Sequence, residues 1–153
     1  MIDKSKTKID EFWQLGSFTS FLGVNNTRIE FVSFEKEKNK SCLVIVPGRS
    51  EGYLKYKEVA YDFFCRGFNL IIMDHRGQGL SQRMTLNPQK GYVSSFSDYV
   101  NDLNVLIDKH LPLHENGEVY LLAHSMGGCI AASYLDVNKC HPFKAAVLTS
   151  PML

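Results

Sequence analysis

The sequence predicts an α/β protein whose mostly parallel sheet is covered by helices on both faces. Short, continuous apolar runs such as residues 41–46 (SCLVIV) are typical of strands buried on both faces of a sheet. Amphipathic segments with apolar side chains at three- and four-residue spacing separate these runs. The two kinds of segment alternate along the chain, which indicates parallel strands joined by helical crossovers.

The first expected strand is Thr27–Glu35, which carries Ile29, Phe31 and Ser33 on one side. Four later apolar runs are expected to be strands buried on both faces. They are Ser41–Val46, Asn69–Asp74, Glu118–Ala123 and Ala145–Thr149. The charged run Glu35–Lys40 is expected to be the solvated tip of a hairpin between the first two strands.

Three helices are expected between these strands. Tyr56–Arg66 has one apolar face and is ended by Gly67. Ser95–His110 shows the clearest helical spacing, and Pro112 lies just beyond its end. Met126–Asp136 follows directly after a strand.

Length and composition favour one globular domain over residues 1–153, because no linker-like stretch divides the chain. The 17 basic and 16 acidic side chains nearly cancel, so nucleic acid is not expected as a partner. No apolar run reaches the ~18 residues that span a bilayer. The start, Met1–Trp13, lacks the apolar middle of a signal peptide.

The four cysteines give no sign of a metal site, because they form no C-x-x-C pair and no histidine lies at zinc-ligand spacing from them. They are expected to be reduced, mostly buried thiols of a cytosolic protein. The four are Cys42, Cys65, Cys129 and Cys140.

The sharpest chemical signal is the segment 123–128 (AHSMGG), which follows a buried strand and opens a helix. This is the context of a nucleophile elbow, G-x-S-x-G, in which Ser125 sits on a strained turn. Small residues are needed around it because the backbone packs tightly. Here Ala123 replaces the first glycine, while Gly127 and Gly128 follow the serine. The alternative is a serine that merely caps the helix.

An acyl-transfer enzyme also needs backbone donors for a developing oxyanion. The N–H of Met126, at the helix start, is one candidate. The segment 46–52 (VPGRSEG) follows another buried strand, and its Gly48 allows close approach of the backbone. We expect the N–H of Arg49 to be the second donor. An ordinary strand-to-helix turn is the alternative.

The segment 74–81 (DHRGQGLS) contains a G-x-G after a strand, but a dinucleotide fingerprint needs a third glycine where Gln82 stands. Since Ser81–Gly91 also has the composition of a loop, we expect a structural loop beside the active site. Asp74 and His75 point to opposite faces of a strand and are interpreted as structural. No remaining histidine is placed as a catalytic base: His110, His114, His124 and His141.

Four segments in this order and spacing resemble the α/β-hydrolase superfamily. They are PGRSEGYLKYKEVAYDFF, IIMDHRGQGLSQR, FSDYVNDL and LLAHSMGG. The resemblance covers about Phe12 to Leu153. Within the superfamily, the four segments resemble most specifically the branch that contains lysophospholipase L2 and the monoacylglycerol lipases. Pro47-Gly48, where the lipases usually have His-Gly, is more similar to the lysophospholipase form.

The resemblance implies a serine esterase that releases the fatty acid from a lysophospholipid, without metal or cofactor. It implies that Ser125 attacks the ester, that the N–H groups of Arg49 and Met126 bind the oxyanion, and that a histidine oriented by an acid acts as base. It also implies a cytoplasmic location. Peripheral contact with the inner membrane and the oligomeric state stay open, and no amphipathic anchor helix is evident.

The family order of the triad is serine, acid, histidine, and only Asp136 and His141 follow Ser125 as candidates. A helix rising 1.5 Å per residue carries Asp136 roughly 16 Å away, so neither is expected to substitute. We therefore expect the N-terminal part of an α/β-hydrolase, with Ala145–Thr149 left as a sheet edge. The triad acid and histidine, the cap and the later strands would be absent, and the chain inactive alone. The alternatives are a non-catalytic degenerate fragment, or a monoacylglycerol lipase or other esterase.

Overall fold

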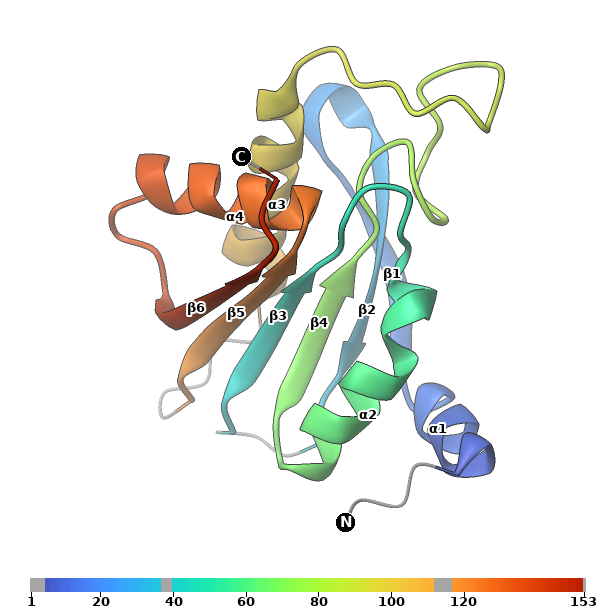
Figure 1. Ribbon diagram of the computed structural model, residues 1–153, viewed down its shortest axis with the longest axis vertical. Coiled ribbons are helices and arrows are strands. Elements are labelled where there is room, and N and C mark those ends of the chain that lie inside the picture. Colours follow the sequence, from blue (N-terminus) through green and yellow to red (C-terminus); the bar gives the residue numbers. More distant parts are fainter. Residues whose placement is uncertain (1–4, 37–39, 112–116, 153) are drawn as a thin grey trace.

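The computed structural model describes residues 5–36, 40–111 and 117–152 and contains one sheet of six strands. The strands lie in the order β1-β2-β4-β3-β5-β6 (Figure 1). Strands β3 to β6 are mutually parallel, as predicted, while β1 and β2 add an antiparallel ribbon beside β4. The bounds are β1 Ser17–Leu22, β2 Arg28–Phe34, β3 Cys42–Val46, β4 Asn69–Met73, β5 Val119–His124 and β6 Phe143–Thr149.

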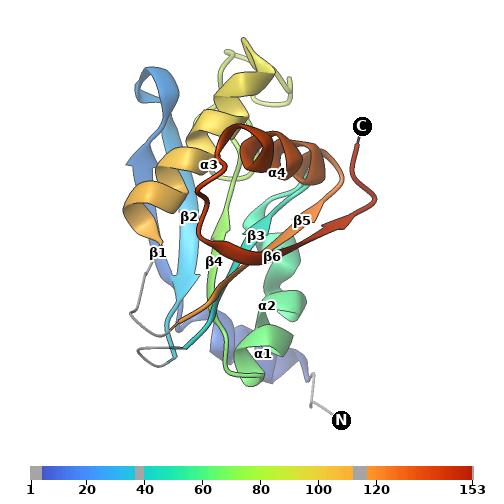
Figure 2. The ribbon, with the colours of Figure 1, turned by 90° about the vertical axis from the view of Figure 1, so that its left-hand side faces the viewer.

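Helices cover both faces of the sheet, as predicted, with α3 and α4 on one side and α1 and α2 on the other (Figure 2). The α-helices are α1 Lys6–Trp13, α2 Lys57–Cys65, α3 Phe96–His110 and α4 Met126–Val137. Two short 3-10 turns complete the regular structure, η1 Val24–Asn26 and η2 Tyr53–Tyr56. Strand β3 is buried throughout, with Val44 in the core under α3 and α4 and Ile45 in the core under α1 and α2.

The predicted burial of the last two strands is wrong. In β5 every second residue is buried, and Leu122 between them is only partly covered, because α1 and α2 pack mainly over β2, β3 and β4. Strand β6 lies at the edge of the sheet, as expected, and most of its residues are exposed, including Val147 at 57%. The apolar sequence of β6 thus lies on an open surface among the described residues.

Two further expectations need correction. Strands β2 and β3 do not form a hairpin, because β4 lies between them. The predicted tip, Glu35–Lys40, includes residues 37–39, which lie outside the described residues. Pro112 and His114 lie outside them as well. The thiols are free, as predicted, but Cys65 and Cys140 are exposed.

The one fully buried cysteine is Cys42, whose burial raises its thiol pKa to about 12. This thiol therefore stays protonated at neutral pH. Within the described ranges, no helix combines the length and apolarity needed to cross a membrane.

A buried ion pair ties the loop after β4 to α3. The Arg76 guanidinium donates to both carboxylate oxygens of Asp102, at 2.6 and 2.7 Å, and also to Asp98. Arg76 and Asp102 are 1% and 0% exposed. The same pair holds η1, because Asp102 accepts from the N–H of Val24 and Arg76 donates to its carbonyl. Together these bonds fix the loop that lies beside the carboxyl ends of the strands.

Candidate active site

Ser125 lies in the sharp turn between β5 and α4, with φ +52° and ψ −120°. An L-residue rarely adopts this backbone conformation. The turn is held by its backbone, since the N–H of Ser125 donates to Thr149 and its carbonyl accepts from Gly128 and Met152. Its hydroxyl makes no cap hydrogen bond, so the alternative of a helix-capping serine is wrong. The expected strand–turn–helix geometry is present.

The small residues around Ser125 are required by close contacts. A Cβ built on Gly127 would lie 2.3 Å from the carbonyl oxygens of Val46 and Pro47. One built on Gly128 would lie 2.9 Å from the Cβ of Pro151. Ala123, in place of the first glycine, is fully buried. The tight packing predicted for these three positions is confirmed.

The strain at Ser125 leads to a stability prediction. We expect Ser125→Gly to raise the free energy of unfolding by about 1 kcal/mol, because glycine adopts this backbone conformation without the cost of a Cβ. Urea denaturation at pH 7 measures it. The matched control is Ser133→Gly inside α4, which should lower the free energy of unfolding by about 0.5–1 kcal/mol. A loss of stability in Ser125→Gly would argue against strain.

The loop after β3 presents one unengaged backbone donor. The N–H of Gly48 donates to the Glu51 carboxylate at 2.8 Å, and the N–H of Ser50 donates to the Gln78 side chain at 2.7 Å. Between them, the N–H of Arg49 makes no hydrogen bond within the described residues. A Cβ built on Gly48 would lie 3.2 Å from the Cβ of Ser125, so this loop runs directly beside the serine.

A second free donor comes from α4. Met126 is the first residue of that helix, so its N–H has no acceptor inside the helix. The N–H groups of Met126 and Arg49 therefore belong to the two segments that meet at Ser125. This is the pair that the sequence predicted as oxyanion donors.

Glu51 and Gln78 shape this loop and were not singled out by sequence reasoning. Besides Gly48, the Glu51 carboxylate accepts from the Tyr56 hydroxyl at 2.6 Å and from Lys55. Burial alone would raise the pKa of Glu51, but these hydrogen bonds outweigh it and lower the pKa from 4.5 to about 2. The only sequence signal is their position: Glu51 lies inside the segment predicted to supply an oxyanion donor, and Gln78 inside the segment predicted to be a structural loop beside the site.

The lowered pKa of Glu51 predicts an acid-dependent loss of stability. Its folded-state pKa lies below the unfolded value, so the contribution is complete above pH 4.5 and is lost as the pH falls toward 2. We expect Glu51→Gln to be less stable than the parent at pH 7, and the gap to narrow at pH 3. Thermal unfolding at both values measures this. A gap that is constant with pH would contradict the assignment.

None of the four described histidines contacts Ser125. The His124 ring pairs with the Thr149 hydroxyl at 3.0 Å. His75 is fully buried, its Nε2–H donates to the Pro47 carbonyl, and burial lowers its pKa to about 4. It is therefore a neutral structural residue, as predicted.

The remaining candidates lie elsewhere. His110 packs between the rings of Phe21 and Phe31, and His141 packs against Phe143. Asp136 pairs with Lys139 near the far end of α4. The described residues thus bring together the serine and the two donors but neither a base nor an acid for it. They also contain no cluster of three potential metal ligands.

The loop from Asp74 to Ser81 is structural, as predicted. The Asp74 carboxylate accepts from the N–H groups of Tyr53 and Leu80, and the Ser81 hydroxyl donates to the Asp74 carbonyl. No helix opens after its glycines. This geometry leaves no place for the helix of a dinucleotide site.

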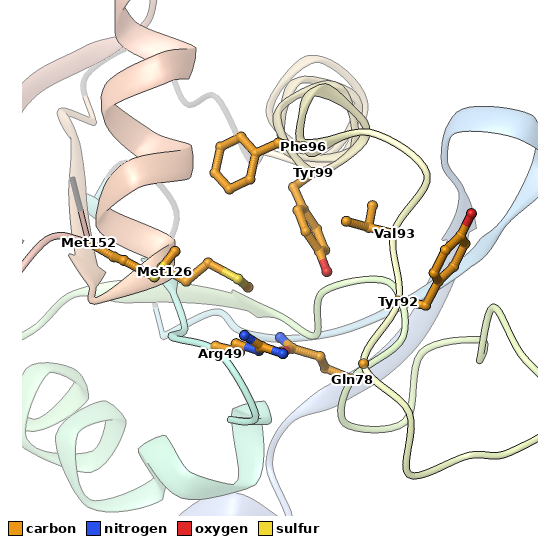
Figure 3. A pocket seen from close by; sticks show the side chains of 9 residues that line it. Arg49, Gln78, Tyr92, Val93, Phe96, Tyr99, Met126 and Met152 are labelled. Atoms are coloured by element: carbon orange, nitrogen blue, oxygen red, sulfur yellow. The ribbon is translucent and has the colours of Figure 1, made fainter.

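A cavity of about 340 Å³ opens beside the two proposed oxyanion donors (Figure 3). Its walls come from the start of α4, the start of α3 and the loop before α3. Most of the lining is apolar or aromatic, and its named side chains are Tyr92, Val93, Phe96, Tyr99, Met126 and Met152. Arg49 and Gln78 close its other side.

The family model described as serine aminopeptidase, S33 matches residues 37–153, which include every element of the site. The chain belongs to the serine aminopeptidase S33 family. This membership confirms the hydrolase class and the fold that the sequence resemblance implied.

Two curated relatives of this chain are longer than it is. Lysophospholipase L2 of Escherichia coli strain K12 is 40% identical over 146 residues, which cover 94% of this chain and 42% of that protein. The probable lysophospholipase L2 of Haemophilus influenzae is 45% identical over 112 residues, covering 73% and 35%. The chain thus spans less than half the length of either relative.

The solved structure of DcsB in complex with its substrate analogue shares the fold. It superposes with a TM-score of 0.73 at 20% identity, covering 90% of this chain and 46% of that one. At this identity the similarity shows the α/β-hydrolase fold alone.

Proposed function

We propose that Ser125 is the nucleophile of a serine ester hydrolase that releases the fatty acid from a lysophospholipid. The observation that carries the proposal is the pair of unengaged N–H groups, from Arg49 and Met126, on the two segments that meet at a strained serine. The similarity to lysophospholipase L2 supports the substrate class.

The chemistry follows from this arrangement. The hydroxyl oxygen of Ser125 bonds to the ester carbonyl carbon while a base takes its proton. The carbonyl oxygen becomes an oxyanion that accepts from the N–H groups of Arg49 and Met126, an interaction worth about 10²–10³ in kcat per donor. The C–O bond to the glycerol then breaks, and its oxygen takes the proton from the base. Water repeats the sequence on the acyl-enzyme and releases the fatty acid.

The apolar cavity is proposed to hold the acyl chain. Met126 lines it and also supplies one of the proposed oxyanion donors, so a chain lying there would place its ester at Ser125. Phe96 and Tyr99 would give the first methylene groups aromatic surfaces to pack against.

The base and its acid are proposed to come from residues outside the described ones, because each described histidine is engaged elsewhere. Loss of the base in a comparable serine hydrolase costs about 10⁶ in kcat. We therefore propose that this chain is inactive by itself. A cytoplasmic site of action, with contact to a lipid surface to reach the substrate, belongs to the same proposal.

Fatty acid release from a lysophosphatidylethanolamine tests this function. Two proteins are compared: this chain, and an extended chain in which the C-terminal part of the E. coli relative follows Leu153. We expect release from the extended chain only. Equal rates would contradict the proposed missing base, and no release from either, with both folded, would favour a non-catalytic protein.

A further inference from the structure

A second cavity, of about 300 Å³, adjoins the apolar one and differs from it in charge. The two share Arg49, Gln78 and Gly91 in their linings. The second also contains Arg83, while glycine, proline and uncharged side chains form the rest. Two arginine side chains therefore line this cavity, and no carboxylate is among its lining residues.

The two arginines are not neutralised by acids. The Arg83 guanidinium donates to three backbone carbonyls, those of Gly79, Ser81 and Pro88, which fix its position without cancelling its charge. Arg49 makes neither an ion pair nor a hydrogen bond within the described residues. By contrast, Arg76 and Arg28 each pair with a carboxylate.

The acid that feels the charge of Arg83 is already engaged. Burial raises the pKa of Asp74 and the charge of Arg83 acts against that rise, yet both oxygens of that carboxylate already accept backbone N–H bonds from Tyr53 and Leu80. Nor does a side chain occupy the space at Gly91, where a Cβ would lie 3.7 Å from the Arg49 guanidinium. The cavity thus has the charge and the room for an anion.

We propose that Arg49 and Arg83 bind the phosphodiester of a glycerophospho headgroup. Guanidinium groups match the geometry of phosphate oxygens and bind them in pairs. In a lysophospholipid the phosphate is separated from the ester only by the glycerol backbone. Two cavities that adjoin at Arg49, in the loop that runs beside Ser125, therefore suit the acyl chain and the phosphate of one substrate. The proposal rests on the proposed function, whose substrate it defines further. It assigns discrimination between a lysophospholipid and an uncharged monoacylglycerol to these two arginines.

The test is an NMR titration of this chain that follows the arginine Nε–H signals. The probes are glycerophosphoglycerol, inorganic phosphate and glycerol. We expect saturable shifts of the Arg49 and Arg83 signals with glycerophosphoglycerol and none with glycerol. Arg49→Gln should weaken binding about tenfold, the loss of one charge-assisted hydrogen bond. Arg66→Gln, at the residue that follows α2, is the matched control and should bind like the parent.

Arg83→Gln should weaken binding as much, and Arg83→Lys, which keeps the charge, should recover part of it. The Arg49 variant decides the matter if the Arg83 variants fail to fold, because the Arg49 side chain makes no hydrogen bond or ion pair within the described residues. Binding that Arg49→Gln leaves unchanged, the absence of saturable binding, or binding of inorganic phosphate only would overturn the headgroup assignment.

This test is independent of ester hydrolysis, since its probes carry no acyl chain. Headgroup binding by this chain, together with a folded extended chain in which Ser125 does not react, would remove the proposed function and leave an anion site. Reaction of Ser125 without headgroup binding would support the proposed function and remove the headgroup site.

Discussion

Ser125→Ala is expected to lower kcat for ester hydrolysis by the extended chain by about 10⁶-fold, the scale seen when a serine hydrolase loses its nucleophile. The reason is that the two proposed oxyanion donors and the acyl cavity would remain while the covalent route disappears. The hydroxyl makes no hydrogen bond among the described residues, so the substitution leaves the fold intact. Fatty acid release under saturating substrate measures the effect.

The matched control is Ser133→Ala, a serine two turns further along α4, which should retain full activity. Thermal unfolding of both variants excludes a folding defect. A Ser125→Ala variant that kept a tenth of the parent's kcat would contradict a covalent role for this serine.

Asp102→Ala is expected to lower the free energy of unfolding by about 3–5 kcal/mol, because it leaves the Arg76 charge buried without its main partner. Both side chains are excluded from water, and Asp102 also accepts the N–H of Val24. The loss would release the loop after β4 from α3. Urea denaturation at pH 7 measures it.

Asp136→Ala is the control for charge alone. Asp136 is an exposed acid paired with Lys139, so its loss should change the free energy of unfolding by less than about 1 kcal/mol. The double replacement Arg76→Met, Asp102→Leu should be less destabilised than Asp102→Ala, since the Arg76 guanidinium no longer stays buried without its main partner and the further ion pair lost, to Asp98, is the longer one at 3.3 Å. If Asp102→Ala unfolded like the parent, the ion pair would not hold the loop.

Most of the central sheet could be predicted from the sequence, because a strand buried on both faces has a uniform apolar sequence. Strand β1 could not, since it is an edge strand with one buried residue, Phe21. Helix α1 has only eight residues and buries just Phe12 and Trp13 at its end, which is too short for a clear helical period. The edge position of β6 was expected, but the exposure of its faces was missed, because its apolar sequence is like that of a strand covered by helices.

The local part of the site was predictable for a related reason. The turn at Ser125 and the small residues at Gly127 and Gly128 are consecutive in the chain, so their spacing carries the geometry. The hydrogen bond from Ser50 to Gln78 joins residues 28 positions apart, and nothing in either motif signals it. Nor does either motif signal that Arg49 and Arg83 line the same cavity.

Covalent labelling tests the central claim most directly. The extended chain is treated with a serine-reactive fluorophosphonate, and the modified residue is located by mass spectrometry of its peptides. The account predicts one adduct, on Ser125, with labelling that is far weaker in the unextended chain and absent from Ser125→Ala. An adduct on another serine, or a folded extended chain in which Ser125 stays unmodified, would contradict it.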